Sequence, residues 1–293
     1  MKTWIILKER NKNVNYETDR LLEEGGQGTS LIYHPQIDIV VSREDRRSIL
    51  LKGKTVDLPD VVIPRMGSGT GYFGHSVLRH LERLGVPVLN TSAAVEVTKD
   101  KLHASQVFAE NHLPTPKTML VKDPINVKLV EQEIGFPCVV KIFAGSYGKG
   151  VYLCQDKQGL QDFVEFAHGI KSDEAIIVQE YIASRPGQDV RVLVVGNTVL
   201  GAMKRSSKDG SFKANITRGG VGENFPLNDK IVDIALKTTN ALGLDIAGVD
   251  LLFDGDDYKL CEANSAPGFK GFEKYTGVNV AKAIIDYARY RAT

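Results

Sequence analysis

The sequence predicts a mixed fold, in which an α/β segment is followed by two α+β segments. Three observations predict it. A strand, a helix and another strand alternate in the first third of the chain, at the spacing of a parallel βαβ unit. The prolines Pro114 and Pro116 then end an expected helix. Beyond Arg185-Pro186-Gly187 the pattern becomes that of antiparallel hairpins.

The first third contains short apolar runs that suit the strands of a parallel sheet. We expect strands at Trp4–Leu7, Val61–Pro64 and Val86–Asn90. Gly74–Leu84 is an expected helix, because apolar residues recur there at i, i+1, i+4 and i+7. The first 60 residues otherwise show only a general α/β pattern.

The middle third begins with an expected helix over Thr98–Asn111, with Thr98 as its N-cap and the two prolines at its end. Strands and helices then alternate. The expected strands are Lys117–Val121, Cys138–Phe143, Val151–Cys154 and Ala175–Gln179, and the helices are Asn126–Ile134 and Lys157–Ala167.

The last third has the turn signal Gly196-Asn197 between the expected strands Asp189–Val195 and Thr198–Lys204. The elements expected after them are a helix at Asp229–Leu242, a hairpin over Gly248–Asn264 and a helix at Val280–Ala292. These changes of pattern predict three small domains around a shared cleft, over residues 1–97, 98–186 and 187–293.

The composition excludes several classes of protein. Lys and Arg number 37 against 36 Asp and Glu, so we expect neither nucleic acid nor a membrane surface as the main partner. No apolar run has the length of a signal or membrane segment, and no H-E-x-x-H pair indicates a zinc hydrolase. Cys138, Cys154 and Cys261 lie in β-rich stretches and predict buried free thiols in a reducing cytoplasm.

Gly69–Gly74 has the G-x-G-x-x-G spacing of a dinucleotide-binding turn, between a strand and a helix. That turn also requires an acidic residue at the end of the next strand. Here the next strand ends at Asn90, and the nearest acid is Glu96. We therefore favour a glycine-rich loop that faces a substrate. Arg65 either meets a carboxylate or phosphate there or forms a surface or interdomain ion pair.

A second glycine-rich stretch is K-I-F-A-G-S-Y-G-K-G, which starts at Lys141 on an expected strand and ends at Gly150. Glycines allow backbone N–H groups to approach phosphate oxygens closely. A Walker A loop is excluded, because Gly150 stands where that loop has Ser or Thr. The stretch is either a phosphate-covering loop or a plain β-hairpin turn.

Two polar stretches follow. Val178–Ile182 reads V-Q-E-Y-I and could offer its strand end to an adenine edge, although Gln-Glu pairs usually face solvent. Farther on, the cations Lys204, Arg205 and Lys208 precede T-R-G-G at Thr217–Gly220. This second stretch is either an anion site or a solvated basic loop.

The hairpin near the C-terminus carries the strongest site pattern. Asp250 lies in G-V-D-L-L-F, and Glu262 and Asn264 lie in C-E-A-N-S-A-P-G. Residues two apart on a strand share a face, and the turn folds Asp250 back towards Glu262. Two unpaired carboxylates and an amide oxygen would suit Mg²⁺ bridged by nucleotide phosphates. The alternative is a solvated hairpin end with a hydrogen-bonded asparagine.

Taken in order, Lys141 with its glycine loop, Q-E-Y-I, N-I-T-R-G-G, and D-L-L-F followed by E-A-N-S-A-P-G resemble the motif set of ATP-grasp enzymes. P-R-M-G, T-K-D-K-L, F-K-A-N-I-T-R-G-G and E-K-Y-T-G-V-N-V resemble the RimK-type α-L-glutamate ligases of that superfamily. The resemblance implies an ATP-grasp fold with a Rossmann-like pre-ATP-grasp domain at residues 1–97. A central subdomain with a glycine-rich lid and a C-terminal subdomain with a metal site would follow.

The same resemblance implies ATP bound between two antiparallel sheets, with Mg²⁺ or Mn²⁺, as two ions. The implied nucleotide-binding residues are Lys101, Lys141, Gly145, Ser146, Gly148, Gly150, Gln179, Glu180, Tyr181, Ile182, Asp189, Lys213 and Asn215. The implied metal ligands are Asp250, Glu262 and Asn264, and Arg205, Arg218 and Arg191 are the expected catalytic residues. Arg191 could instead brace Asp189. Lys213-Ala214-Asn215 replaces the family's Arg-Ser-Asn, and a lysine is a point charge rather than a fork.

The implied activity is a cytoplasmic ATP-dependent carboxylate–amine ligase that acts through an acyl phosphate. It would add L-glutamate or a similar amino acid to an amine or peptide acceptor, as a dimer or tetramer. An amino-group carrier protein or a cofactor precursor is the alternative acceptor. A non-catalytic nucleotide-binding regulator and a dinucleotide-dependent oxidoreductase are the alternative classes.

Overall fold

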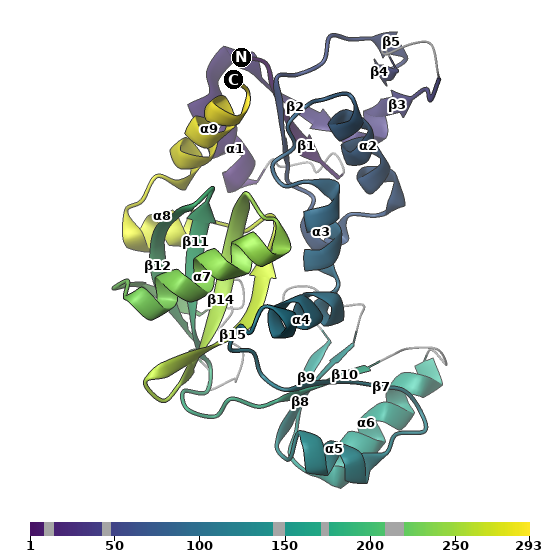
Figure 1. Cartoon of the computed structure of the whole chain (residues 1–293), viewed down its shortest axis with the longest axis vertical. Helices are drawn as coiled ribbons and strands as arrows, with labels where there is room; N and C mark the ends of the chain where they lie inside the picture. Colours follow the sequence, from purple (N-terminus) through teal and green to yellow (C-terminus); the bar gives the residue numbers. More distant parts are fainter. Residues whose placement is uncertain (9–14, 43–47, 143–149, 171–175, 209–219) are drawn as a thin grey trace.

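Three main sheets with their helices, and a small fourth sheet, make up an elongated molecule (Figure 1). The computed structural model describes residues 1–8, 15–42, 48–142, 150–170, 176–208 and 220–293. The sheet of the first third lies at one end of the molecule. The sheet of residues 118–180 lies at the other end, and the sheet of residues 188–264 lies between them.

The first sheet is parallel, with strand order β2-β1-β6. Its elements and those around it are β1 (Thr3–Leu7), α1 (Tyr16–Gly25), η1 (Gly26–Gly28), β2 (Thr29–Tyr33), η2 (His34–Gln36), β6 (Val61–Pro64), η3 (Gly67–Gly69) and α2 (Tyr72–Arg83). A small separate sheet contains β3 (Ile37–Ile39), β4 (Ile49–Leu51) and β5 (Lys54–Thr55). The expected parallel arrangement is confirmed. The expected strand at Val86–Asn90 is wrong, because only Val88 forms a bridge, to Val62.

The single helix expected over Thr98–Asn111 is also wrong. Two helices, α3 (Ser92–Lys99) and α4 (Lys101–Glu110), meet at Asp100, whose backbone is extended. The Asp100 carboxylate accepts hydrogen bonds from the first amides of α4 and is therefore its N-cap. Thr98, the expected cap, lies inside α3.

The central sheet is antiparallel, with strand order β7-β10-β8-β9. Its strands are β7 (Thr118–Val121), β8 (Cys138–Ile142), β9 (Val151–Cys154) and β10 (Ile176–Glu180). Helices α5 (Val127–Glu133) and α6 (Lys157–Ile170) pack on one face of this sheet and give it a separate apolar core. Cys138 and Cys154 are buried free thiols there, as expected, whereas Cys261 of the third sheet is partly exposed.

The third sheet is antiparallel, with strand order β13-β12-β11-β14-β15. Its elements are β11 (Gln188–Val195), β12 (Thr198–Ser206), β13 (Val221–Phe225), α7 (Asp229–Leu242), β14 (Ile246–Asp254), β15 (Asp257–Asn264), α8 (Lys270–Thr276) and α9 (Val280–Arg291). Alternate residues of β11 face opposite sides. Val192 packs in a core with α7, α3 and α4, while Leu193 packs in a core with α8 and α9. The sheet is therefore covered on both faces.

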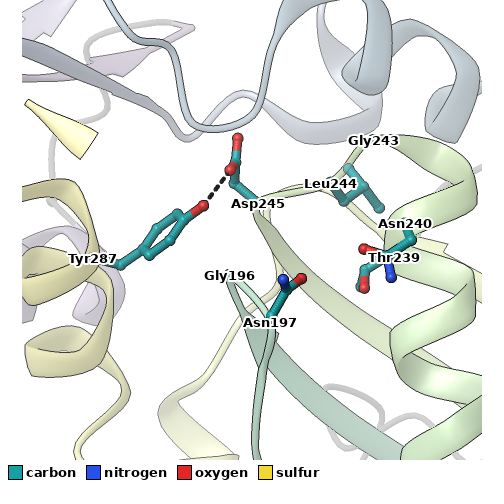
Figure 2. A pocket seen from close by; sticks show the side chains of 8 residues that line it. All are labelled: Gly196, Asn197, Thr239, Asn240, Gly243, Leu244, Asp245 and Tyr287. Atoms are coloured by element: carbon teal, nitrogen blue, oxygen red, sulfur yellow. Dashed lines mark hydrogen bonds between the residues drawn. The ribbon is translucent and has the colours of Figure 1, made fainter. Parts of the chain in front are cut away.

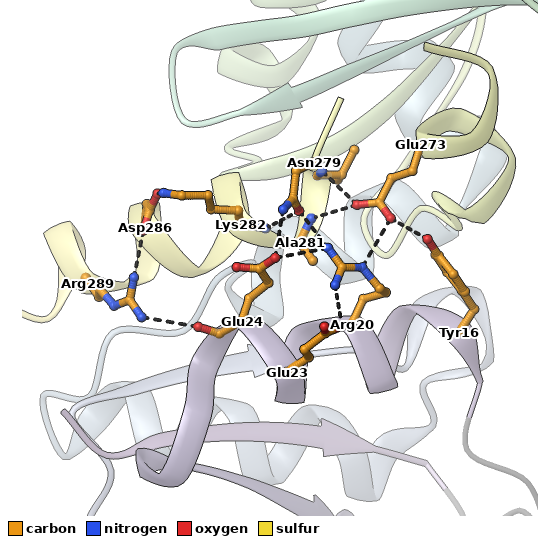
Figure 3. A network of polar contacts seen from close by, with 11 residues as sticks. Tyr16, Arg20, Glu23, Glu24, Glu273, Asn279, Ala281, Lys282, Asp286 and Arg289 are labelled. Atoms are coloured by element: carbon orange, nitrogen blue, oxygen red, sulfur yellow. Dashed lines mark hydrogen bonds and ion pairs between the residues drawn. The ribbon is translucent and has the colours of Figure 1, made fainter. Parts of the chain in front are cut away.

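The first and last parts of the chain share one core. Ile5 and Val61 of the first sheet pack in the same buried cluster as Phe269 and Ile284. Beside it, Figure 3 shows a polar network between α1 and the helices α8 and α9, centred on Arg20. The expected domain boundaries stay a prediction. Helix α4, which falls in the expected central domain, packs against the core of the third sheet.

Candidate active site

The predicted nucleotide-binding lysine of the central sheet, Lys141, lies on β8 and is almost fully buried. Its ammonium donates to Gln179 Oε1 at 2.7 Å, and Gln179 Nε2 donates to Thr118 Oγ1 at 2.9 Å. A buried charge requires such partners. The three side chains form a polar row across β8, β10 and β7. Thr118 was not a sequence candidate, because only the sheet pairing brings it beside Gln179.

Lys141 faces residues from two other parts of the chain. Burial lowers the pKa of Lys101, at the start of α4, and Glu262 opposes that shift while Lys141 adds to it. Burial raises the pKa of the Cys261 thiol to about 12, against the effect of Lys141. The charges of Lys141 and Glu262 therefore lie close enough to Lys101 and Cys261 to influence their pKa values. Helix α4 contacts both β7 of the central sheet and β15, so these three parts of the chain meet here, and the roles of Lys101, Lys141 and Glu262 stay predictions.

A second group of charges lies on β11, β12 and β14. Arg205 donates to both oxygens of Asp189, at 2.6 and 2.7 Å, and its Nη2 also lies 2.9 Å from Asp250 Oδ2. Arg191 binds Asp250 through Nε and through Nη2, the latter at 2.7 Å. Strand register produces this order, because Asp189 stands opposite Arg205 and Arg191 stands opposite Asp250. These four side chains are called the Asp–Arg network below.

The network contradicts two expectations. Asp250 is not an unpaired carboxylate, since its side chain is 4% exposed and contacts two guanidinium groups. Burial alone would raise the pKa of Asp250, but Arg191 and Arg205 outweigh burial and lower it. Nor does Arg191 brace Asp189, whose bidentate partner is Arg205. Burial raises the pKa of Asp189 in spite of Arg205.

The expected pairing of the C-terminal hairpin is confirmed. Asp250 stands directly opposite Glu262, and a bulge follows Asp250. Residues directly opposite each other in an antiparallel pair share a face, so both carboxylates lie on one side of the sheet. Asn264 stands opposite Gly248 and donates its amide nitrogen to Gly248 O at 3.4 Å. Its amide oxygen is therefore the end that can bind a metal.

These three residues fit a divalent cation that is also held by another ligand. The described part of the chain has no group of three or more His, Cys, Asp or Glu that could hold a metal ion. Glu262 and Asn264 offer hard oxygen donors, while Asp250 already balances two guanidiniums. Mg²⁺ usually takes only one or two protein carboxylates, together with phosphate oxygens and water. The donor set matches that pattern rather than an all-protein cage.

Other predicted residues have mixed outcomes. Glu180 accepts a hydrogen bond from Lys117 N at 3.0 Å, and Ile182 is buried. Tyr181 is partly exposed beside them. Gly150 has φ +75, and a Cβ there would lie 2.5 Å from Ile142, so this position requires glycine. The expected residues Gly145, Ser146, Gly148, Lys213, Asn215 and Arg218 lie outside the described residues.

The loop after β6 faces the end of β15. A Cβ on Gly67, which has φ +56, would lie 3.7 Å from the Ala266 side chain. Arg65 donates to Pro267 O at 2.8 Å, and its guanidinium lies 5.7 Å from the Phe269 ring centre. Arg65 therefore joins the first and last parts of the chain by a hydrogen bond and a cation–π contact.

A surface cavity of about 230 Å³ is lined by none of the charged residues described above (Figure 2). Its lining residues are Gly196, Asn197, Thr239, Asn240, Gly243, Leu244, Asp245 and Tyr287. It lies at the β11–β12 turn, at the opposite end of β11 from Asp189. None of the predicted site residues lines this cavity. The candidate site is therefore the place where α4, the central sheet and β15 meet beside the Asp–Arg network. No described helix has the length and apolar character needed to cross a bilayer.

The sequence comparisons with known proteins agree on one family. The RimK-like ATP-grasp domain matches residues 98–288, and the RimK PreATP-grasp domain matches residues 1–95. A probable alpha-L-glutamate ligase 1 of Shewanella frigidimarina is 35% identical over 286 residues, which cover 97% of this chain and 94% of that protein. A ribosomal protein bS6–L-glutamate ligase of Salmonella schwarzengrund is 38% identical, with 84% and 82% covered.

Among solved structures, the ATP-grasp ligase PsnB, complexed with a phosphomimetic variant of its minimal precursor, Mg and ADP, has a TM-score of 0.77. It is 20% identical, and the match covers 99% of this chain and 98% of PsnB. At that identity the likeness concerns the fold. It extends over nearly the whole chain.

Proposed function

The chain belongs to the RimK-like ATP-grasp ligase family, and from this premise we propose that it adds L-glutamate to a protein or peptide acceptor. The terminal carboxylate of the acceptor takes the γ-phosphoryl group of ATP, which gives an acyl phosphate and ADP. The amino group of glutamate then displaces phosphate to form an amide. The names of the curated relatives support glutamate as the amino acid and a protein as the acceptor. The observation that carries the proposal is the meeting of α4, which carries Lys101, with the central sheet of Lys141 and with β15, where Glu262 stands opposite Asp250 of the Asp–Arg network.

The lysines bind the nucleotide phosphates. Both come from regular elements, Lys101 from the start of α4 and Lys141 from β8, so their backbones are fixed before the nucleotide arrives. Gln179 accepts a hydrogen bond from the ammonium of Lys141 and so orients it. An ammonium that gains a phosphate partner in a site sheltered from water binds it more strongly than at the surface.

Asp250, Glu262 and Asn264 bind Mg²⁺ together with the nucleotide. When bound, the ion neutralises charge on the phosphoryl group that is transferred. Among the described residues of the site, Lys101, Lys141, Arg191 and Arg205 supply four positive charges against three carboxylates, those of Asp189, Asp250 and Glu262. This positive surplus disfavours a bare cation and favours one accompanied by phosphates. Mn²⁺ is the alternative to Mg²⁺. We propose that two such ions bind with the nucleotide.

Arg191 and Arg205 act first on their carboxylate partners. Arg205 contacts Asp189 and Asp250 at once, which fixes both carboxylates at the floor of the site. A fixed guanidinium near the transferred group would stabilise an acyl phosphate without reorganising. Arg218 has the same proposed role. The assembly that carries the site is proposed to be a dimer or tetramer, which light scattering tests.

The first experiment measures ADP release with ATP and Mg²⁺, for the standard amino acids offered with peptides that end in a free or an amidated carboxyl group. Mass spectrometry identifies the product. We expect ADP release that requires both glutamate and a free carboxyl terminus, with a product heavier by one glutamyl unit. Product formed from other amino acids only would overturn the choice of glutamate. A protein that binds no ATP would overturn the ligase itself.

A further inference from the structure

The segment that follows Asn264 is held by side chains from the first third of the chain. This segment, 265–270, connects the end of β15 to α8. Asn90, Arg65 and Glu17 contact it by hydrogen bonds across 175, 202 and 252 positions of sequence. Two proposed metal ligands, Glu262 and Asn264, come directly before it. The first third of the chain is therefore in direct contact with the backbone behind the proposed metal site.

Asn90 makes the most complete of these contacts. Its Nδ2 donates to Ile246 O and to Ser265 O, each at 2.7 Å. Its Oδ1 accepts from Asp245 N at 2.6 Å and from Ile246 N at 2.8 Å. A side-chain amide has two N–H donors and two acceptor positions, so all four are used. The residue is fully buried, with 0% of its surface exposed.

The position of Asn90 in the sheet explains what these bonds do. The ladder between β14 and β15 ends at the pair Gly248 and Asn264. Beyond that pair the Asn90 amide lies between Ile246 on β14 and Ser265 after β15, and it bonds to both. It thus continues the ladder in place of a peptide group. It sets the separation of the two strands at the level of Asn264.

Two further contacts fix the same segment. Arg65 donates to Pro267 O at 2.8 Å. Glu17 accepts from Phe269 N at 3.0 Å and from Lys270 N at 3.2 Å, at the start of α8, where Phe269 offers no side-chain cap of its own. Phe269 is fully buried. The segment therefore has side-chain contacts at both ends and in the middle, all from the first third of the chain.

We propose that Asn90 is a positioning residue for the metal–nucleotide site, because it fixes the end of β15 against β14 and thereby aims Glu262 and Asn264. The proposal rests on the function proposed above. Mg²⁺ requires ligands in near-ideal octahedral positions, so a small displacement of β15 weakens its binding. Residues that orient metal ligands from behind typically change metal affinity by about 10- to 100-fold when replaced.

The test compares the affinity of ADP with Mg²⁺ and with EDTA, by calorimetry, in the parent and in Asn90→Asp. Aspartate has nearly the shape of asparagine but lacks the N–H donors to Ile246 O and Ser265 O. We expect the Mg²⁺-dependent gain in ADP affinity to fall at least about tenfold, while affinity in EDTA is kept. No acceptor is needed, so the test does not depend on knowing the substrate.

The matched control is Asn279→Ala. Asn279 also joins the first and last parts of the chain, through Glu24 and Arg20 (Figure 3), but it is the N-cap of α9, and its hydrogen bonds within the described chain go to α1 and α9 rather than to residues 265–270. We expect it to lower thermal stability and to leave the Mg²⁺-dependent gain unchanged. An equal loss in both variants would overturn the proposal, because it would reflect general destabilisation.

A second variant tests the proposal if Asn90→Asp does not fold. Arg65→Met removes the hydrogen bond to Pro267 O and keeps most of the side-chain volume, and we expect the Mg²⁺-dependent gain to fall at least about threefold. A parent-like gain in every variant that folds would overturn the proposal. A parent protein that binds ADP equally well with Mg²⁺ and with EDTA would instead contradict the proposed metal site.

Discussion

The carboxylates of Asp189 and Asp250 share one guanidinium group. Arg205 Nη2 lies 2.7 Å from Asp189 Oδ2 and 2.9 Å from Asp250 Oδ2. Two carboxylates so close together in a buried place would repel each other without this cation. Arg205 therefore keeps the carboxylates of Asp189 and Asp250 side by side at the candidate site.

Replacement of this shared cation is expected to destabilise the fold. In Arg205→Met, Asp189 loses its bidentate partner and Asp250 retains only Arg191. We expect the free energy of unfolding in urea to fall by about 3–5 kcal/mol, as is usual when one partner of a buried ion pair is removed. The control is Lys204→Met, next on β12, whose partner Glu223 is 58% exposed. That variant should lose less than about 1 kcal/mol. Similar losses in both would contradict a special role for Arg205.

Removal of Lys141 is expected to affect nucleotide binding. Lys141→Met takes the ammonium away from the place where we locate the phosphates. We expect the affinity for ATP, measured by calorimetry, to fall by at least about tenfold, because a hydrogen bond to a charged group contributes about 1.5–3 kcal/mol. Lys157→Met, a mostly exposed lysine on α6 paired with Glu131, is the control and should bind as the parent does. Parent-like affinity in Lys141→Met would remove Lys141 from the site.

The parts of the site that the sequence predicted depend on local signals. The turn at Asp254–Asp257 is marked by its residues, and it fixes the pairing of Asp250 with Glu262. The position of Lys141 on a strand before a glycine loop is equally local. The family resemblance, which the comparisons confirm, adds the order of the motifs. These signals were sufficient to predict the pairing of Asp250 with Glu262 and the place of Lys141 on a strand.

The rest depends on contacts between distant residues. The partners of Asp189 and Asp250 follow from the register of three strands, which no single stretch of sequence specifies. Asn90 looked only like the end of a strand, whereas its four hydrogen bonds reach residues more than 150 positions away. The break at Asp100 was missed because the apolar pattern of α3 continues into α4, although Asp is a good N-cap.

The pH dependence of stability should contain a contribution from His75. This side chain is buried in α2, and burial lowers its pKa from the ordinary value of 6.5. A lowered folded-state pKa means that the unfolded chain takes up a proton first as the pH falls. The stability contribution is therefore complete above pH 6.5 and is lost as the pH falls through the folded-state pKa.

His75→Gln tests this contribution by urea unfolding between pH 7 and pH 5. We expect the variant to lose stability with falling pH less steeply than the parent, by up to about 1.4 kcal/mol per pH unit. Burial also lowers the pKa of His80, and the contribution of His80 to the pH dependence of stability is present in both the parent and the variant. His103→Gln, an exposed histidine on α4, is the control for histidine replacement. Identical slopes in parent and His75→Gln would refute the assignment.

Glu262 is expected to be essential for turnover. Asp250 already pairs with Arg191 and Arg205, so Glu262 supplies the proposed carboxylate ligand for which the structure shows no guanidinium partner among the described residues. We expect Glu262→Ala to lower turnover by at least about 10³-fold, which corresponds to about 4 kcal/mol of transition-state stabilisation. Glu223→Gln, an exposed carboxylate on β13, should retain parent activity. Turnover of Glu262→Ala within tenfold of the parent would rule Glu262 out as an essential ligand.

The charge of the site predicts that Mg²⁺ and nucleotide bind together. Without phosphates the cation would join a place with more positive than negative side chains, and Asp250 is already neutralised by Arg191 and Arg205. We expect calorimetric titration with Mg²⁺ alone to show no saturable binding below about 1 mM, because one or two carboxylates hold this ion weakly.

With ADP present, the apparent affinity for Mg²⁺ should rise at least about tenfold after correction for Mg²⁺ bound to free ADP. By thermodynamic linkage, Mg²⁺ must raise the affinity for ADP by the same factor. Glu262→Gln should reduce both factors together, since it removes a ligand that the ion uses only in the complex. Tight binding of Mg²⁺ without nucleotide would show instead that the protein alone supplies the ion's ligands, and the charge argument would fail.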